Sequence, residues 1–133
     1  MLVWRPFSGL FCKARAFSRA LKRVHMSHYL FLESRDPFES RDQFVIDLAT
    51  TLKQRGHDVT VFLVQNGVLA ARRKAFPSQL PRLVEAGITT LVDDFSLSER
   101  GMQEVELLSG IQQTNIDSIV DILVDENTKA IWH

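Results

Sequence analysis

Residues 28–64, HYLFLESRDPFESRDQFVIDLATTLKQRGHDVTVFLV, decide the fold of this chain. They contain two short apolar runs, YLFLE at 29–33 and VTVFLV at 59–64. Runs of this length and composition are typical of buried parallel strands, because a buried helix would need more residues. We therefore expect two strands of a parallel sheet here.

A helix start signal lies between these two runs. Asp36 can cap a helix, Pro37 suits its first position, and Glu39 completes a capping-box arrangement. The pattern predicts a helix over residues 37–55, and Gly56 supplies a left-handed stop. Strand, helix and strand predict a βαβ unit with a right-handed crossover.

The same alternation continues downstream of this unit. After a break at Asn66-Gly67 we expect a loop region over 68–76 that contains a short apolar turn at 68–71. A short helix between Ser78 and Gly87, a strand at 88–92 and a turn at 93–95 follow. The remaining expected elements are a short helix capped by Ser96 and ending near Gly101, a weak strand at 111–113, a helix opened by Thr114 or Asn115, and a last strand at 129–132. Such alternation predicts an α/β sandwich with a mostly parallel sheet.

Composition places the chain among soluble globular proteins. Its 133 residues suit one domain, and 45% apolar and 24% charged residues exclude collagen-like and disordered classes. A single cysteine, Cys12, cannot form an intramolecular disulfide, and no apolar run is long enough to span a membrane. His25 and His28 lack an acidic or sulfur ligand beside them. We therefore expect a cytoplasmic protein with no metal and no cofactor.

Charge divides the chain into an N-terminal arm, residues 1–27, and a body, residues 28–133. The arm holds six basic residues and no acidic one, which leaves ten basic and sixteen acidic residues for the body. This balance argues against nucleic acid as a partner of the body. Within the arm, apolar residues recur at spacings of four and three and predict an amphipathic helix with a basic opposite face. They are Leu10, Ala14, Phe17, Leu21 and Val24.

The arm has several interpretations. We favour the interpretation that Met26, directly before the first strand, is the true start, and that the arm is translated upstream sequence. A basic amphipathic helix also suits a membrane surface, a transit peptide or a partner groove.

Candidate ligand-binding residues gather at the carboxyl ends of the expected strands, where open parallel sheets bind ligands. These are Ser34, Arg35, Gln65, Asn66, Gly67, Asp93, Asp94 and Ser96. Arg35, Arg41 and the first-helix amides could hold an anion, and Gly67 would let the second loop approach closely. The competing interpretation, which we favour, is that the acidic and hydroxyl residues are simply helix caps.

No catalytic residue follows from the motifs of the common enzyme classes. The chain has no phosphate-loop consensus, no GxGxxG after the first strand and no GxSxG. Asp93 and Asp94 could form an acid–base pair, but adjacent residues on a turn seldom point at one atom.

Three segments resemble a known family: GHDVTVFLVQNGV at 56–68, Glu85-Ala86-Gly87, and Glu99-Arg100-Gly101. In this order and spacing, over about residues 28–133, the chain resembles the DsrE/DsrF/TusD-like sulfur-relay family. The resemblance implies a DsrE-like three-layer α/β sandwich with a mainly parallel five-stranded sheet. It also implies homo- or hetero-oligomers, commonly trimers or hexamers, and a persulfide carried on a cysteine just after the third strand.

The position of that cysteine falls at or next to Asp93 in this chain. A carboxylate cannot form a persulfide, and Cys12 precedes the matching region. We therefore expect a DsrE-like oligomeric binding or accessory protein without persulfide chemistry of its own, acting through a sulfur-relay protein partner or a small anionic ligand. The alternatives are a sulfurtransferase component whose cysteine comes from a partner, and an enzyme that uses Asp93 or Asp94.

Aromatic content also favours an oligomer. The body carries more aromatic surface than a small sandwich readily hides, so some of it should lie in subunit contacts. The residues concerned are Phe38, Phe44, Phe62, Phe76, Phe95 and Trp132.

Overall fold

The computed structural model describes residues 25–36, 43–73 and 78–133. The predicted arm helix, the helix start at Pro37 and Glu39, and Arg41 lie outside the described residues. Phe38 and Phe76 lie outside them as well.

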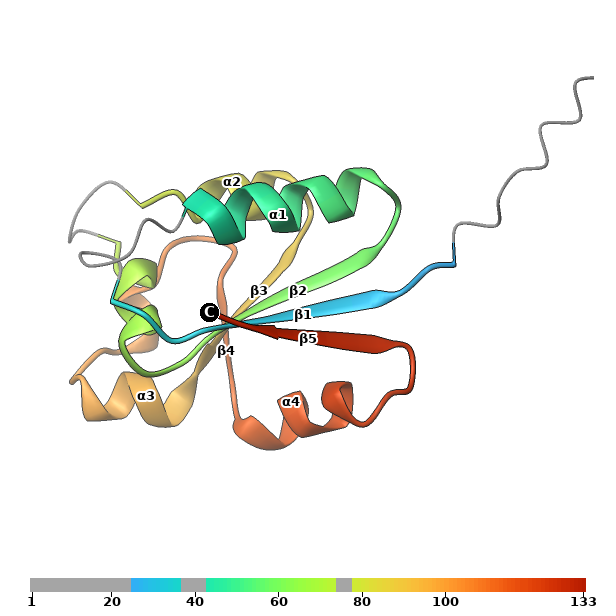
Figure 1. The fold of residues 1–133 in the computed structure, drawn as a ribbon. Coiled ribbons are helices and arrows are strands. Elements are labelled where there is room, and N and C mark those ends of the chain that lie inside the picture. Colours follow the sequence, from blue (N-terminus) through green and yellow to red (C-terminus); the bar gives the residue numbers. More distant parts are fainter. Residues whose placement is uncertain (1–24, 37–42, 74–77) are drawn as a thin grey trace, which may run out of the picture.

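The sheet is formed by five parallel strands in the order β4-β3-β2-β1-β5 (Figure 1). Their bounds are β1 His28–Glu33, β2 Asp58–Leu63, β3 Thr89–Asp93, β4 Gln112–Thr114 and β5 Thr128–Trp132. Each observed boundary lies within one residue of the expected one. The predicted α/β class is confirmed, and every strand pair is parallel.

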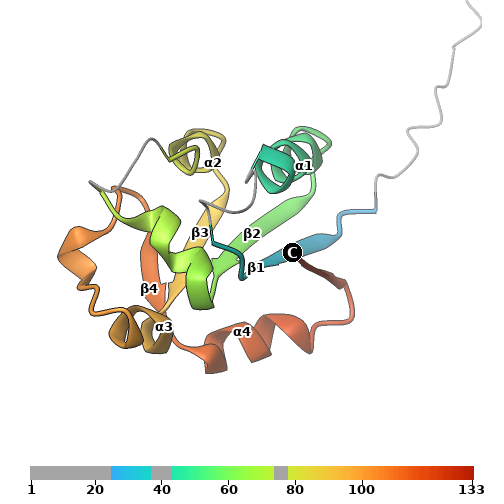
Figure 2. The same cartoon turned by 60° about the vertical axis from the view of Figure 1, so that its left-hand side comes forward.

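Helices cover both faces of the sheet and give three layers. Helix α1 (Gln43–Gln54) and α2 (Pro81–Glu85) lie on one face, and α3 (Asp94–Glu99) and α4 (Ile116–Leu123) lie on the other (Figures 1 and 2). Two 3-10 helices, η1 (Gln65–Ala71) and η2 (Glu104–Glu106), complete the elements. Across the described ranges, the helices are all too short or too polar to cross a bilayer.

Two local expectations are wrong. Residues 65–71 form η1, which begins directly after β2 and not with the turn expected at 68–71, because the Gly67 N–H donates to the Val64 carbonyl. The expected turn at 93–95 is helical, because α3 starts at Asp94 and its cap is Asp93 rather than Ser96. The end of a buried strand therefore serves directly as a helix cap.

The two faces of the sheet have cores of unequal size. The α1/α2 face holds the larger one, around Phe31, Ile46 and Leu63. Among the described residues, Leu30, Phe62 and Ile119 form a separate, smaller cluster beside α4, whereas Leu97 of α3 belongs to the larger one. Of the aromatic residues expected in subunit contacts, Phe62 is buried in the core, whereas three others are exposed on the surface. The exposed ones are Phe44, Phe95 and Trp132.

Candidate functional site

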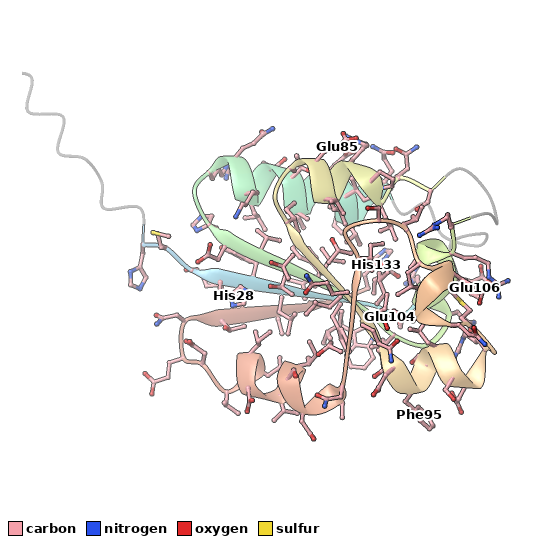
Figure 3. The ribbon with its side chains drawn as sticks, turned by 180° about the vertical axis from the view of Figure 1, so that it is seen from behind. His28, Glu85, Phe95, Glu104, Glu106 and His133 are labelled. Atoms are coloured by element: carbon pink, nitrogen blue, oxygen red, sulfur yellow. The ribbon has the colours of Figure 1, made fainter. Side chains whose placement is uncertain are left out.

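The carboxyl edge of the sheet brings all eight candidate residues together in space, because parallel strands end at one edge. Figure 3 shows His133 near the point where the strands converge, with His28 toward the opposite end. We call the segments that follow β1, β2 and β3 the first, second and third loops.

At the end of β1, a buried carboxylate meets an imidazole from the end of the chain. Glu33 is 5% exposed, and its Oε2 lies 2.7 Å from His133 Nδ1. Its Oε1 accepts a hydrogen bond from the Arg35 backbone N–H at 2.9 Å. Because an ionised carboxylate only accepts, His133 Nδ1 is the donor of this hydrogen bond when Glu33 is ionised. We call these two residues the Glu33–His133 dyad.

Ser34 joins the first loop to β5. Its backbone N–H donates to the His133 carbonyl at 3.0 Å, and its hydroxyl donates to the same oxygen at 3.2 Å. The Trp132 indole N–H in turn donates to the Ser34 hydroxyl at 3.1 Å. Ser34 is therefore occupied by structural hydrogen bonds, whereas the Arg35 side chain is exposed.

The second loop lies directly against the first. A Cβ added at Gly67 would overlap the Glu33 carbonyl oxygen and approach its carbon, so only glycine permits this contact. The Val64 N–H donates to the same Glu33 carbonyl at 2.9 Å. The close neighbour of Gly67 is therefore the backbone of β1, and its approach to a ligand stays a prediction.

The third loop is tied to the second through Ser96. The buried Asp93 Oδ2 accepts from the Ser96 N–H at 2.9 Å and from its hydroxyl at 2.5 Å. The Ser96 hydroxyl oxygen accepts from the Gln65 N–H at 2.9 Å, and Gln65 itself has a positive φ of 49°. Asp94 instead caps its neighbour, because its Oδ1 accepts from the Phe95 N–H at 2.7 Å. The two carboxylates thus bind different donors and do not act as a pair.

Arg100 forms a second bridge between these loops. Its guanidinium donates to Asn66 Oδ1 at 2.8 and 3.1 Å and to the Ser96 carbonyl at 3.1 Å. This network uses the side chains of Asn66, Ser96 and Asp93, and Asp94 accepts from the Phe95 N–H outside it, so few of the predicted residues keep side-chain groups for a ligand. Arg35 is the exposed cation of the eight.

A small cavity lies at the carboxyl edge, among the residues that the structure describes. It has a volume of about 10 Å³, which is the space of a single water, and lies between Glu33, Gly67 and the apolar core. A wider open hollow of about 240 Å³ lies at the opposite edge, beside His28, Lys53 and Asp58. Within the described ranges, no three His, Cys, Asp or Glu side chains gather as a metal site.

Four residues of this edge were missed by the sequence reasoning: Glu33, Arg100, Trp132 and His133. Glu33 carried a signal, because it is the one acidic residue in an otherwise apolar strand. His133 carried none, because its contact with Glu33 spans 100 positions and depends on β5 lying beside β1. Arg100 was noted only as part of a segment that resembles a family.

Comparison with known proteins places this geometry in context. A model of the DsrE/DsrF-like family matches residues 27–128. Similar solved structures include the ychN protein from E. coli, with a TM-score of 0.71 and 17% identity over 81% of this chain and 100% of that chain. A protein of unknown function from Methanobacterium thermoautotrophicum, MTH1491, has a TM-score of 0.66 and 21% identity over 81% and 99% of the two chains.

A third similar structure is BT1422 from Bacteroides thetaiotaomicron, a conserved protein of unknown function. It has a TM-score of 0.67 and 15% identity over 80% of this chain and 95% of that chain. At these identities the structures show a shared fold, and no curated protein matches the chain. Because the family model spans well over half of the residues, the chain belongs to the DsrE/DsrF-like family.

Proposed function

We propose that this protein is an oligomeric DsrE-like binding or accessory protein, related to sulfur-relay proteins, that carries out no persulfide step of its own. One observation carries the proposal. The resemblance implies a sulfur-carrying cysteine at or next to the last residue of β3, which here is Asp93; this residue is 7% exposed, and its carboxylate already accepts two hydrogen bonds from Ser96.

The chemistry of that position supports this conclusion. A sulfane sulfur is accepted by a thiolate, which forms a sulfur–sulfur bond, whereas a carboxylate oxygen cannot hold it. Asp93 also does structural work, because it caps α3 and orients Ser96 toward the second loop. The single cysteine of the chain, Cys12, lies outside residues 27–128, which match the family.

Binding through the surface fits the rest of the edge. Hydrogen bonds crosslink the described loops of this edge, and the side chains of Arg35 and Trp132 are exposed. We propose a protein partner or a small anion at this edge, with Arg35 as the cationic contact. Exposed Phe44, Phe95 and Trp132 support assembly into a trimer or hexamer. We further propose that the protein works in the cytoplasm.

The decisive experiment incubates the protein with a persulfide donor and then measures the intact mass of the chain. The full-length Cys12→Ser variant should gain no stable sulfur, because it has no thiol. The wild-type chain, which differs only at Cys12, reports any sulfur that this thiol collects. Addition of one sulfur mass to Cys12→Ser that a reductant removes would overturn the proposal.

A second function is favoured by the Glu33–His133 dyad. An imidazole oriented by a buried carboxylate can take a proton from a thiol supplied by a partner, as a sulfur-relay component would require. The test measures sulfane-sulfur transfer from cysteine persulfide to glutathione. The accessory function predicts the same rate with and without the protein. A rate increase that His133→Gln abolishes would favour the relay function instead.

A further inference from the structure

The outer side of β5 is an open edge of the sheet. Among the described residues, β5 pairs with β1 alone, and Figure 1 shows it as the last strand on that side. Its sequence, TKAIW, contains one charged residue, Lys129, and no proline, whereas the other edge strand, β4, is only three residues long. Short strands, prolines and charges protect sheet edges, because an exposed edge pairs readily with another strand. Of the two edges, β5 is therefore the better one for pairing.

The hydrogen bonds of β5 show which backbone groups this edge offers. The Asn127 carbonyl accepts from an N–H of β1 at 3.1 Å, and the His133 N–H donates to a carbonyl of β1 at 2.9 Å. Because such groups alternate between the two sides of a strand, Thr128, Ala130 and Trp132 turn theirs outward. The Thr128 N–H already donates to the turn before β5 at 2.9 Å, which leaves its carbonyl. Within the described ranges, no hydrogen bond reaches the outward N–H and carbonyl groups of Ala130 and Trp132.

We propose that the outer edge of β5 pairs antiparallel with the same edge of a second copy of this chain. With a two-fold axis at Ala130, the Ala130 N–H of each copy donates to the Ala130 carbonyl of the other. The Trp132 N–H then faces the free Thr128 carbonyl of the second copy. Lys129 lies opposite Ile131 of the second copy, so no like charges meet along the paired strands. The edge is thus complementary to itself.

The charges beside the strand also match in this arrangement. Antiparallel pairing places the turn before one β5 next to the end of the other, because the two strands run in opposite directions. The turn carries the exposed acids Asp125 and Glu126. The exposed cation Arg35 lies close to the end of β5, because the Ser34 N–H donates to the His133 carbonyl. A parallel arrangement would instead bring the two acidic turns together, so charge favours the antiparallel one.

This contact rests on the proposed function, which includes assembly into a trimer or hexamer, and it specifies that assembly. A two-fold contact joins copies in pairs and has no place within a single ring of three. A hexamer that consists of two trimers contains such pairs. The pairing of β5 therefore selects the hexamer.

Disulfide formation between copies tests the register. In the full-length Cys12→Ser chain, Ala130→Cys places one thiol at the two-fold axis, where paired Cα atoms lie about 5.5 Å apart, within reach of a disulfide. Lys129→Cys is the matched control, because its Cα atom would lie about 8 Å from that of the same residue in the second copy, beyond this reach. Under a mild oxidant, the intermolecular disulfide should form at least about tenfold faster in Ala130→Cys, after correction for the rate of each thiol with a small reagent. Equal corrected rates would overturn the proposal.

A second pair of variants tests the backbone hydrogen bond. Ala130→Pro removes the outward N–H, and an edge strand tolerates proline where its N–H faces outward. The mass from light scattering should fall from that of a hexamer to that of a trimer, whereas Ala130→Ser keeps the N–H and should keep the hexamer. An unchanged circular-dichroism spectrum checks that the fold survives. An unchanged mass in Ala130→Pro, or a trimeric wild-type chain, would overturn this pairing and leave the proposed assembly in place, whereas a wild-type monomer would contradict both.

Discussion

Replacing Asp93 by alanine should destabilise the protein far more than a typical surface substitution. The change removes the cap of α3, which costs about 0.5–2 kcal/mol. It also removes the acceptor of the buried Ser96 hydroxyl, and an unsatisfied buried polar group costs about 1–3 kcal/mol. Together we expect a loss of about 2–4 kcal/mol of unfolding free energy.

Thermal unfolding at a fixed protein concentration measures this loss, which corresponds to roughly 10–20 °C in Tm for a domain of this size. Asp94→Ala is the matched control, because the neighbouring carboxylate accepts one exposed N–H and should cost less than about 1 kcal/mol. A double-mutant cycle with Ser96→Ala should show a coupling energy of about 0.5–3 kcal/mol. An Asp93→Ala chain as stable as the control would refute the structural role and leave the carboxylate available for chemistry.

Three further predictions address the same edge and the assembly. Gly67→Ala should lower the free energy of unfolding in urea by about 1–3 kcal/mol, because its Cβ would overlap the Glu33 carbonyl. An unchanged urea midpoint would show that the second loop can move away from β1 without cost. Arg35→Ala should weaken the binding of thiosulfate, measured by calorimetry, about fivefold, whereas Arg55→Ala, at the far end of α1, should leave it unchanged. Equal effects of the two substitutions would mean that the carboxyl edge is not the anion site. Light scattering of the full chain should give a mass well above that of a monomer, and a clean monomer at micromolar concentration would contradict the argument from exposed aromatic residues.

Residues of the candidate site divide into those that build the edge and those that face outward. Asp93, Ser96 and Gln65 form a continuous hydrogen-bonded chain from the third loop to the second. Glu33 and Ser34 join the first loop to β5. A scaffold crosslinked in this way keeps its surface rigid, and recognition by a rigid surface costs less ordering entropy than recognition by free loops.

The sequence positions of the five strands could be predicted from local patterns to within one residue, whereas η1 and the start of α3 could not. Apolar runs such as YLFLE and VTVFLV predict buried parallel strands. Asn115 predicts the start of a helix, and Gly56 predicts the end of one. Because each of these signals concerns neighbours a few positions apart, no knowledge of the folded chain is needed to interpret them. The carboxyl edge could be predicted for the same reason, since parallel strands must end together.

The identity of the working side chains at that edge depended on contacts between distant residues. Asp93 looks like a turn residue in the sequence, and only its burial beside Ser96 makes it a helix cap. Glu33 meets His133 because β5 pairs with β1, a strand order that arises from packing and that no local pattern encodes. The exposed apolar residues of α4, Ile116, Val120 and Leu123, also depend on the tertiary structure. Their helical periodicity is visible in the sequence, but which apolar residues face water is settled by where the helix lies on the sheet.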